Sequence, residues 1–319
     1  MRPTALPTIA ALVVGIVAVS SSAPLIVYAA APALAIAFWR NALAVGVLAP
    51  VTGTGRRREL LSLTSGDGRR TGAWSVLAGL ALAVHFGTWV PSAKLTSIAA
   101  ATALVCTSPV WTALIASLRG ARIPGTTWIG IAVAVLGAAL ATGADITVSG
   151  RAVTGDLLAL AGGLAGAVYA TYGERARVSL STTTYTTVCY SVCAAALVLV
   201  CLVARVPLHG YAATTWLALA ALTAGPQLLG HSLLNYALRR VSATMISVLI
   251  LLEVPGSALI GWAWLGQVPP VRSVPGLVIL VLGVLVVVAG AARRAGGRSR
   301  GVQPTNGGTA ISPEATGTT

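Results

Sequence analysis

Residues 274–292 read VPGLVILVLGVLVVVAGAA, nineteen consecutive residues without a charged side chain. A helix rises about 1.5 Å per residue, so this run is long enough to cross most of the roughly 30 Å hydrocarbon core of a bilayer. Strands of a transmembrane barrel are shorter and alternate apolar with polar residues, which this run does not do. The stretch therefore predicts a membrane-spanning α-helix.

Similar segments recur along the whole chain. Of the 319 residues, 56% are hydrophobic and only 9% are charged, whereas roughly 25% are charged in soluble proteins. We therefore predict an all-α polytopic membrane protein with ten transmembrane helices. The first segment is interpreted as an uncleaved helix rather than a signal peptide, because nine more segments follow it. Besides 274–292, the predicted segments are 9–31 (the first), 33–53, 72–92, 96–118, 126–144, 155–173, 183–204, 212–238 and 241–264.

Positive charge is unevenly distributed between the loops. The N-terminus, the C-terminal residues and the loops after the second, fourth, sixth and eighth segments hold sixteen arginines, and the opposite loops hold four basic residues. Because basic loops stay in the cytoplasm, this bias predicts that both termini are cytoplasmic and that the protein lies in the inner (cytoplasmic) membrane. Residues 293–319 are rich in Arg, Gly, Thr, Ser and Pro, and we expect a disordered cytoplasmic tail.

Several classes of function lack their sequence signals. The arginines form short islands between apolar runs rather than one basic face, so no nucleic-acid partner is predicted. The four cysteines lie inside apolar runs without metal-ligand spacing, so we predict no metal site and no cofactor. A phosphate-binding G-x-x-x-x-G-K-[ST] motif is missing, so transport would run on a gradient rather than on nucleotide hydrolysis.

The two halves of the chain are related to each other. Residues 97–124 align without gaps to 242–269, with six identical positions, and Pro109 and Pro255 fall within one position of each other. Five helices per half is an odd number, so the second half must enter the membrane inverted. Inverted repeats are typical of secondary transporters, whose substrate site lies near the midplane. We predict repeats at 1–150 and 151–292, with helix kinks at Pro109 and Pro255.

Four short motifs give the sequence a resemblance to a known family. Residues 155–160 (GDLLAL), 234–241 (LNYALRRV) and 108–110 (SPV), together with Glu253 two residues before Pro255, resemble motifs of the EamA family in the drug/metabolite transporter superfamily. The resemblance implies ten helices in two inverted five-helix repeats, with both termini inside. The first helix departs from the family pattern, since it has VSSS where a Trp-Gly pair is usual. Such positions line the cavity in the family, so this departure bears on the substrate.

Charged residues inside the predicted helices are the main site candidates. Glu253 lies near the middle of the ninth segment, where a charge costs roughly 2.5–3.5 kcal/mol and should face the protein interior. Its carboxylate would hold a substrate cation or a proton, or else lock the helix to a neighbour. Arg40 would bind a substrate carboxylate or extend to the membrane interface. His85 and His231 would relay protons or serve as structural hydrogen-bonding groups.

Uncharged candidates in the third, fourth, sixth and eighth predicted helices accompany these residues. Amides, hydroxyls and indoles would form the amphipathic wall of a central cavity. They are Ser108, Trp89, Trp111, Tyr169, Gln227 and Asn235.

These observations together predict a secondary transporter of a small metabolite. We expect an exporter of amino-acid-like or amphipathic compounds that works by alternating access between the two repeats. Proton coupling and a homodimer stay open. Two alternatives also stay open: a lipid or lipid-carrier flippase of the same fold, and a membrane-embedded acyltransferase. No enzymatic activity and no catalytic residue are predicted.

Overall fold

The structure is a computed structural model and describes residues 6–66, 68–95, 101, 104–142, 150–266, 268 and 271–300. This part of the chain contains helices, turns and loops, and no strand. Eight helices are long and apolar enough to cross a membrane, and two shorter apolar helices, Ser108–Leu118 and Gly125–Ala141, accompany them. The predicted all-α membrane class is confirmed. Ten complete crossings and the cytoplasmic termini stay predictions.

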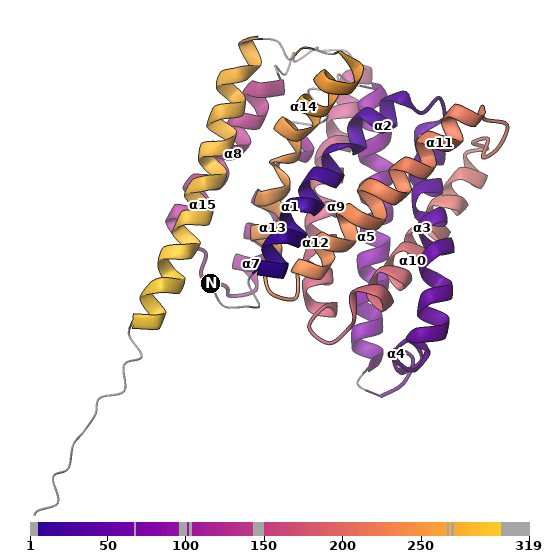
Figure 1. The fold of residues 1–319 in the computed structure, drawn as a ribbon, viewed down its shortest axis with the longest axis horizontal. Coiled ribbons are helices and arrows are strands. Elements are labelled where there is room, and N and C mark those ends of the chain that lie inside the picture. The colour runs from indigo at the N-terminus through magenta and orange to yellow at the C-terminus, as the bar shows by residue number, and fades with distance from the viewer. Residues whose placement is uncertain are drawn as a thin grey trace, which may run out of the picture.

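The helices follow one another with short connections (Figure 1). In chain order they are α1 (Leu6–Ser20), α2 (Ser22–Tyr28), α3 (Ala33–Gly55), α4 (Arg57–Ser62), α5 (Gly68–Leu95), α7 (Ser108–Leu118), α8 (Gly125–Thr142), α9 (Gly150–Ala176), α10 (Thr182–Val203), α11 (Ala213–Leu222), η1 (Thr223–His231), α12 (Ser232–Ala237), α13 (Ala243–Ile250), α14 (Glu253–Leu265), η2 (Val271–Ser273) and α15 (Val274–Arg300).

Three predicted segments extend beyond the described residues, and one of them is the helix predicted at 126–144, of which residues 143–144 lie outside. The predicted tail starts at 293, whereas α15 continues to Arg300; residues 301–319 lie outside the described part. Residues 96–100, at the start of the fourth predicted helix, also lie outside it.

Helices α8 and α15 form a tight pair at one side of the bundle (Figure 1). Glycines make the close approach possible: a Cβ added at Gly137 would lie 2.2 Å from the backbone nitrogen of Leu280, and one at Gly283 would lie 2.3 Å from that of Ala134. Small residues that allow backbones to approach are the usual means of helix association in membranes. The pair is therefore held together by backbone-level packing.

Helices α3, α5, α9 and α10 pack into the largest buried core. Tyr185, Tyr190, Cys189 and Cys193 of α10 are fully buried there. The cysteines thus fill space between helices, as small apolar side chains do.

Several helices are interrupted within the bundle. The chain turns at Cys106–Thr107 before α7 and at Leu251–Leu252 before α14. Each turn precedes a proline, Pro109 or Pro255, which cannot donate a backbone hydrogen bond and whose ring clashes with the carbonyl four residues earlier. The two turns are 145 residues apart, the offset of the internal repeat.

The first and eighth predicted helices are also irregular. At Ser21 the chain turns between α1 and α2, and its hydroxyl donates to the Ala18 carbonyl at 2.8 Å. Thr223–His231 forms a π-helix that contains Pro226. π-helical turns are rare and are often found at functional sites.

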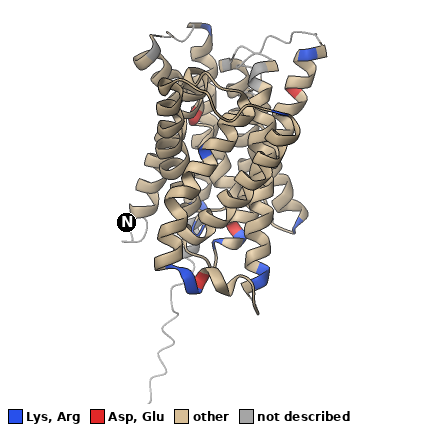
Figure 2. Ribbon diagram, turned by 90° about the vertical axis from the view of Figure 1, so that its right-hand side faces the viewer, with Lys and Arg blue, Asp and Glu red and all other residues tan. Residues whose placement is uncertain are grey.

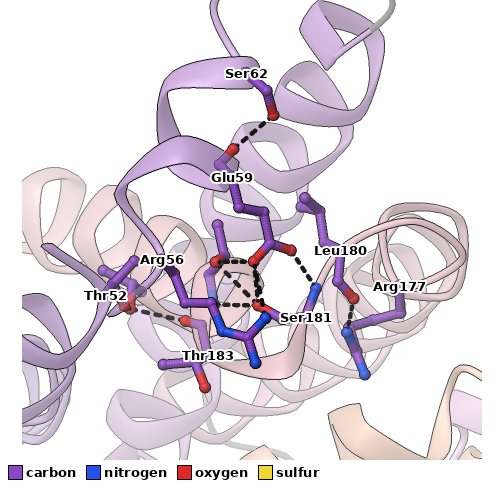
Figure 3. A network of polar contacts seen from close by, with 10 residues as sticks. Thr52, Arg56, Glu59, Ser62, Arg177, Leu180, Ser181 and Thr183 are labelled. Carbon is purple, nitrogen blue, oxygen red and sulfur yellow. Dashed lines mark hydrogen bonds and ion pairs between the residues drawn. The ribbon is translucent and has the colours of Figure 1, made fainter. Parts of the chain in front are cut away.

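Charged residues lie mostly toward the two ends of the helices (Figure 2). At one end, the short helix α4 brings Glu59 to the start of α10 (Figure 3). Its carboxylate accepts hydrogen bonds from the Ser181 backbone N–H at 2.5 Å, the Ser181 hydroxyl at 2.7 Å and the Thr184 hydroxyl at 2.8 Å. An acid at a helix N-terminus satisfies free N–H groups and matches the positive end of the helix dipole. The loop after α3 is thereby attached to α10.

Candidate functional site

A cavity of about 600 Å³ lies among the interrupted helices. It is lined by residues from both halves of the chain, and most of its wall is apolar. Eight of the predicted residues line it: Arg40, His85, Trp89, Ser108, Tyr169, His231, Asn235 and Glu253.

Arg40 projects from α3 and is fully buried. Its guanidinium stands 4.2 Å from the centre of the Phe86 ring, its Nε donates to the Gln227 side-chain oxygen at 2.8 Å, and Nη1 donates to the Ser22 hydroxyl at 3.4 Å. The remaining nitrogen, Nη2, is buried without a hydrogen-bond partner among the described residues. A buried N–H without a partner costs free energy, so Nη2 is a donor that a hydrogen-bond acceptor would stabilise.

Gln227 fixes the Arg40 side chain from behind. It is fully buried in the π-helix η1 and does not line the cavity itself. While its oxygen accepts from Arg40, its nitrogen donates to the Asn41 side-chain oxygen at 3.0 Å. Asn41 in turn donates to the Ala37 carbonyl at 2.9 Å. This chain of hydrogen bonds links α3 to η1 and fixes the position of the Arg40 guanidinium.

The two histidines lie in an aromatic part of the wall. His231 packs edge-on against Phe86, with ring centres 5.7 Å apart, and against Tyr169 at 6.4 Å. His85 donates from Nδ1 to the Gly162 carbonyl at 2.8 Å and stacks on Trp89 at 6.0 Å. In the neutral form Nε2 of His85 is then an acceptor.

The polar groups of the other wall residues differ in whether they have hydrogen-bond partners. The Asn235 side chain donates to the Tyr169 hydroxyl at 2.6 Å, so this pair bridges α12 and α9. The indole N–H of Trp89 is buried and has no partner among the described residues. A second donor among the lining residues is therefore without a hydrogen-bond partner.

Glu253 is the first residue of α14, directly after the turn at 251–252. An acidic side chain at a helix N-terminus is stabilised by the helix dipole. Ser108 is the first residue of α7 and occupies the equivalent position of the other repeat. Within the described part of the chain, no ion pair joins Glu253 to Arg40, although both line the same cavity. The cavity thus holds one basic and one acidic side chain that are not joined in an ion pair.

The two ends of the cavity differ. At one end the wall includes Val268, which is 72% exposed, and the exposed Arg272. At the other end the wall is made of Leu238 and Ile246, which are almost completely buried. The cavity therefore reaches the surface on the side that the arginine distribution predicts to be extracytoplasmic.

The sequence reasoning and the structure differ at several positions. Trp111 does not line the cavity, and its indole N–H donates to the Thr107 hydroxyl at 3.2 Å. Pro109 and Pro255 lie beside the turns and outside the lining. Phe86, which holds Arg40 and His231, was missed as a site residue. A phenylalanine in an apolar helix carries no signal that distinguishes it from lipid-facing residues.

Comparisons with known proteins agree with this architecture. Residues 6–143 and 153–289 each match the EamA-like transporter family. A solved protein crystal structure is similar over 90% of this chain and 98% of its own, with a TM-score of 0.71 and 19% sequence identity. At that identity the similarity shows the fold alone. A comparison with curated proteins gave no match.

Proposed function

Because this chain belongs to the EamA-like transporter family, we propose that it is a gradient-driven exporter of small amphipathic, amino-acid-like solutes. The family match covers both halves of the chain and supports a transporter of small molecules in the bilayer. The substrate class, the direction of transport and the residue roles below are our proposal.

One observation supports the substrate class above all others. Arg40 and Glu253 line one cavity, carry opposite charges and form no ion pair with each other among the described residues. Arg40 keeps a free buried N–H donor, which a substrate carboxylate would satisfy. Glu253 would hold the ammonium group of the same molecule. The aromatic and apolar wall around them suits a hydrocarbon side chain.

Alternating access would use the interrupted helices. Each turn at 106–107 and 251–252 gives a helix two segments that can reorient about a short hinge. Closure of the outer end and opening at Leu238 and Ile246 would expose the same charges to the opposite side. In this cycle Glu253 is also the group that would carry a coupled proton when no substrate is bound, since an acid in a membrane cavity can exchange protons with either side.

The test compares cells that express the wild type, Glu253→Gln or an empty vector at equal membrane abundance. Amino acids and small amphipathic metabolites are quantified inside the cells and in the medium. We expect a solute that accumulates outside with the wild type only. Enrichment that persists unchanged in Glu253→Gln, with unchanged pH dependence, would remove Glu253 from substrate binding and coupling. If the three strains are indistinguishable, the export proposal fails.

A further inference from the structure

A second polar cluster lies at the opposite end of the bundle from the cavity mouth. Arg70 at the start of α5, Arg175 in the last turn of α9 and Arg119 directly after α7 gather around one aromatic pair. Trp74 and Tyr172 stack with their ring centres 5.4 Å apart. The three guanidinium carbons lie 5.8 Å (Arg70) and 4.8 Å (Arg175) from the Trp74 ring and 6.0 Å (Arg119) from the Tyr172 ring. We call these five residues the arginine–aromatic cluster.

The cluster concentrates three positive charges, which the single neighbouring acid, Glu174, offsets only in part. All three arginines are exposed, and within the described residues none forms an ion pair. Glu174 is the acid beside them, but it is half-buried and accepts a hydrogen bond from the Ala243 backbone. Partial burial and then the neighbouring Arg175 guanidinium lower the pKa of Arg119. Like charges that are held together in this way are stabilised by a bound anion.

The position of the cluster indicates the anion. It lies where three predicted membrane helices end, on the side that carries most of the arginines. Trp and Tyr at helix ends favour the headgroup level of a bilayer. Basic pockets between membrane helices at this depth bind anionic lipid headgroups, and the fork of a guanidinium matches the geometry of phosphate.

We propose that the arginine–aromatic cluster is a binding site for the phosphate headgroup of an anionic phospholipid. A headgroup bound there would contact three helices. One is α7, which follows the turn at Cys106–Thr107, and the others are the uninterrupted helices α5 and α9. It would hold the three helix ends together on the side where the cavity is closed.

The test uses the full-length protein in nanodiscs of phosphatidylcholine, with or without an equal part of phosphatidylglycerol. Lipids retained by the protein are counted by native mass spectrometry, and melting temperatures are recorded. We expect preferential retention of phosphatidylglycerol and a higher melting temperature in its presence. Equal retention of both lipids by the unaltered protein would overturn the proposal without any variant.

Variants then locate the site. Arg70→Gln, Arg119→Gln and Arg175→Gln are combined in one protein. The matched control combines the equivalent substitutions at three other exposed arginines of the same end, Arg57, Arg58 and Arg69, and loses the same charge. We expect the cluster variant to lose about fivefold in phosphatidylglycerol affinity per arginine and the control to keep its preference.

Two outcomes contradict the proposal. Equal losses in the cluster variant and the control would mean diffuse attraction to the membrane surface. Displacement of phosphatidylglycerol by inorganic phosphate at comparable concentration would mean a site for soluble anions. Neither outcome depends on solute transport, so the proposed export function is tested separately.

Discussion

At the scale of single residues, the important contacts join positions far apart in the sequence. Arg40 and Gln227 are separated by 187 positions and form one 2.8 Å hydrogen bond. The sequence predicts that a buried arginine needs partners, because an isolated charge in a bilayer is costly. It does not predict which amide supplies them, since that depends on how α3 packs against η1. Gln227 was therefore expected in the wall, whereas it lies behind Arg40.

Gln227 allows stability and substrate binding to be separated. In Gln227→Leu the Arg40 Nε loses its acceptor, so we expect a stability loss of roughly 1–3 kcal/mol and a lower melting temperature. In Gln227→Glu a carboxylate of the same shape would pair with Arg40. We expect that protein to stay folded but to bind anionic solutes at least about tenfold more weakly, because the charge of Arg40 is neutralised. Unaltered solute affinity in Gln227→Glu would argue against Arg40 as the anion site.

Glu59, at one end of the bundle, makes the stability of the folded protein depend on pH. Partial burial raises the pKa of its carboxyl, but the hydrogen bonds from Ser181 and Thr184 and the nearby Arg56 outweigh this, and the pKa is lowered below 4.5. A lowered pKa means stabilisation that is complete above the unfolded value and is lost as the pH falls through the folded value. We expect Glu59→Gln to cost about 1 kcal/mol at neutral pH. Melting temperatures of the two proteins should converge as the pH falls through the lowered pKa of Glu59; a constant difference would contradict this assignment.

At the scale of helices, the lengths of the apolar runs and the positions of the prolines predict most of the helices and their interruptions. The run at 274–292 became the long helix α15, and the chain turns just before Pro109 and Pro255. No comparable sequence pattern predicts the π-helix at Thr223–His231. Pro226 lies within it, but a proline alone does not distinguish a kink from a π-turn, because both relieve the same missing hydrogen bond.

The α8–α15 pair predicts a strong effect of a small change. In Gly283→Val the new side chain would meet the Ala134 backbone, and neither helix can yield without separating from the other. We expect a loss of roughly 1–3 kcal/mol in stability. The control is Gly46→Val in α3, where an added Cβ has no atom within 4 Å. Similar melting temperatures for the two variants would mean that the pair is not held by backbone contact.

At the scale of the whole molecule, composition and the arginine count predict a membrane protein with a definite orientation. The class and the family are established, whereas the orientation stays a prediction because the fold alone has no reference to the membrane. A measurement of access to the cavity in cells would provide that reference. The exposed end of the cavity includes Arg272 and its buried end includes Leu238.

Cys106 reports this access directly. Its thiol lines the cavity, whereas the other three cysteines do not. A membrane-impermeant maleimide added to intact cells should label Cys106 from outside, and the labelling should disappear in Cys106→Ala. Bound substrate should slow the reaction. Labelling that occurs only in inside-out vesicles would reverse either the predicted orientation or the open side.

The two helix turns lie at equivalent positions of the two repeats, and this bears on the relative free energies of the conformations that the protein can adopt. In an inverted duplication with identical halves, exchanging the conformations of the halves would convert the outward-open arrangement into an inward-open arrangement of the same free energy. Ser108 and Glu253 occupy equivalent positions but differ in charge, so they remove this degeneracy. In the proposed transport cycle, the differences between the halves would then set the preferred resting conformation, and protonation or pairing of Glu253 would shift the balance between the two conformations.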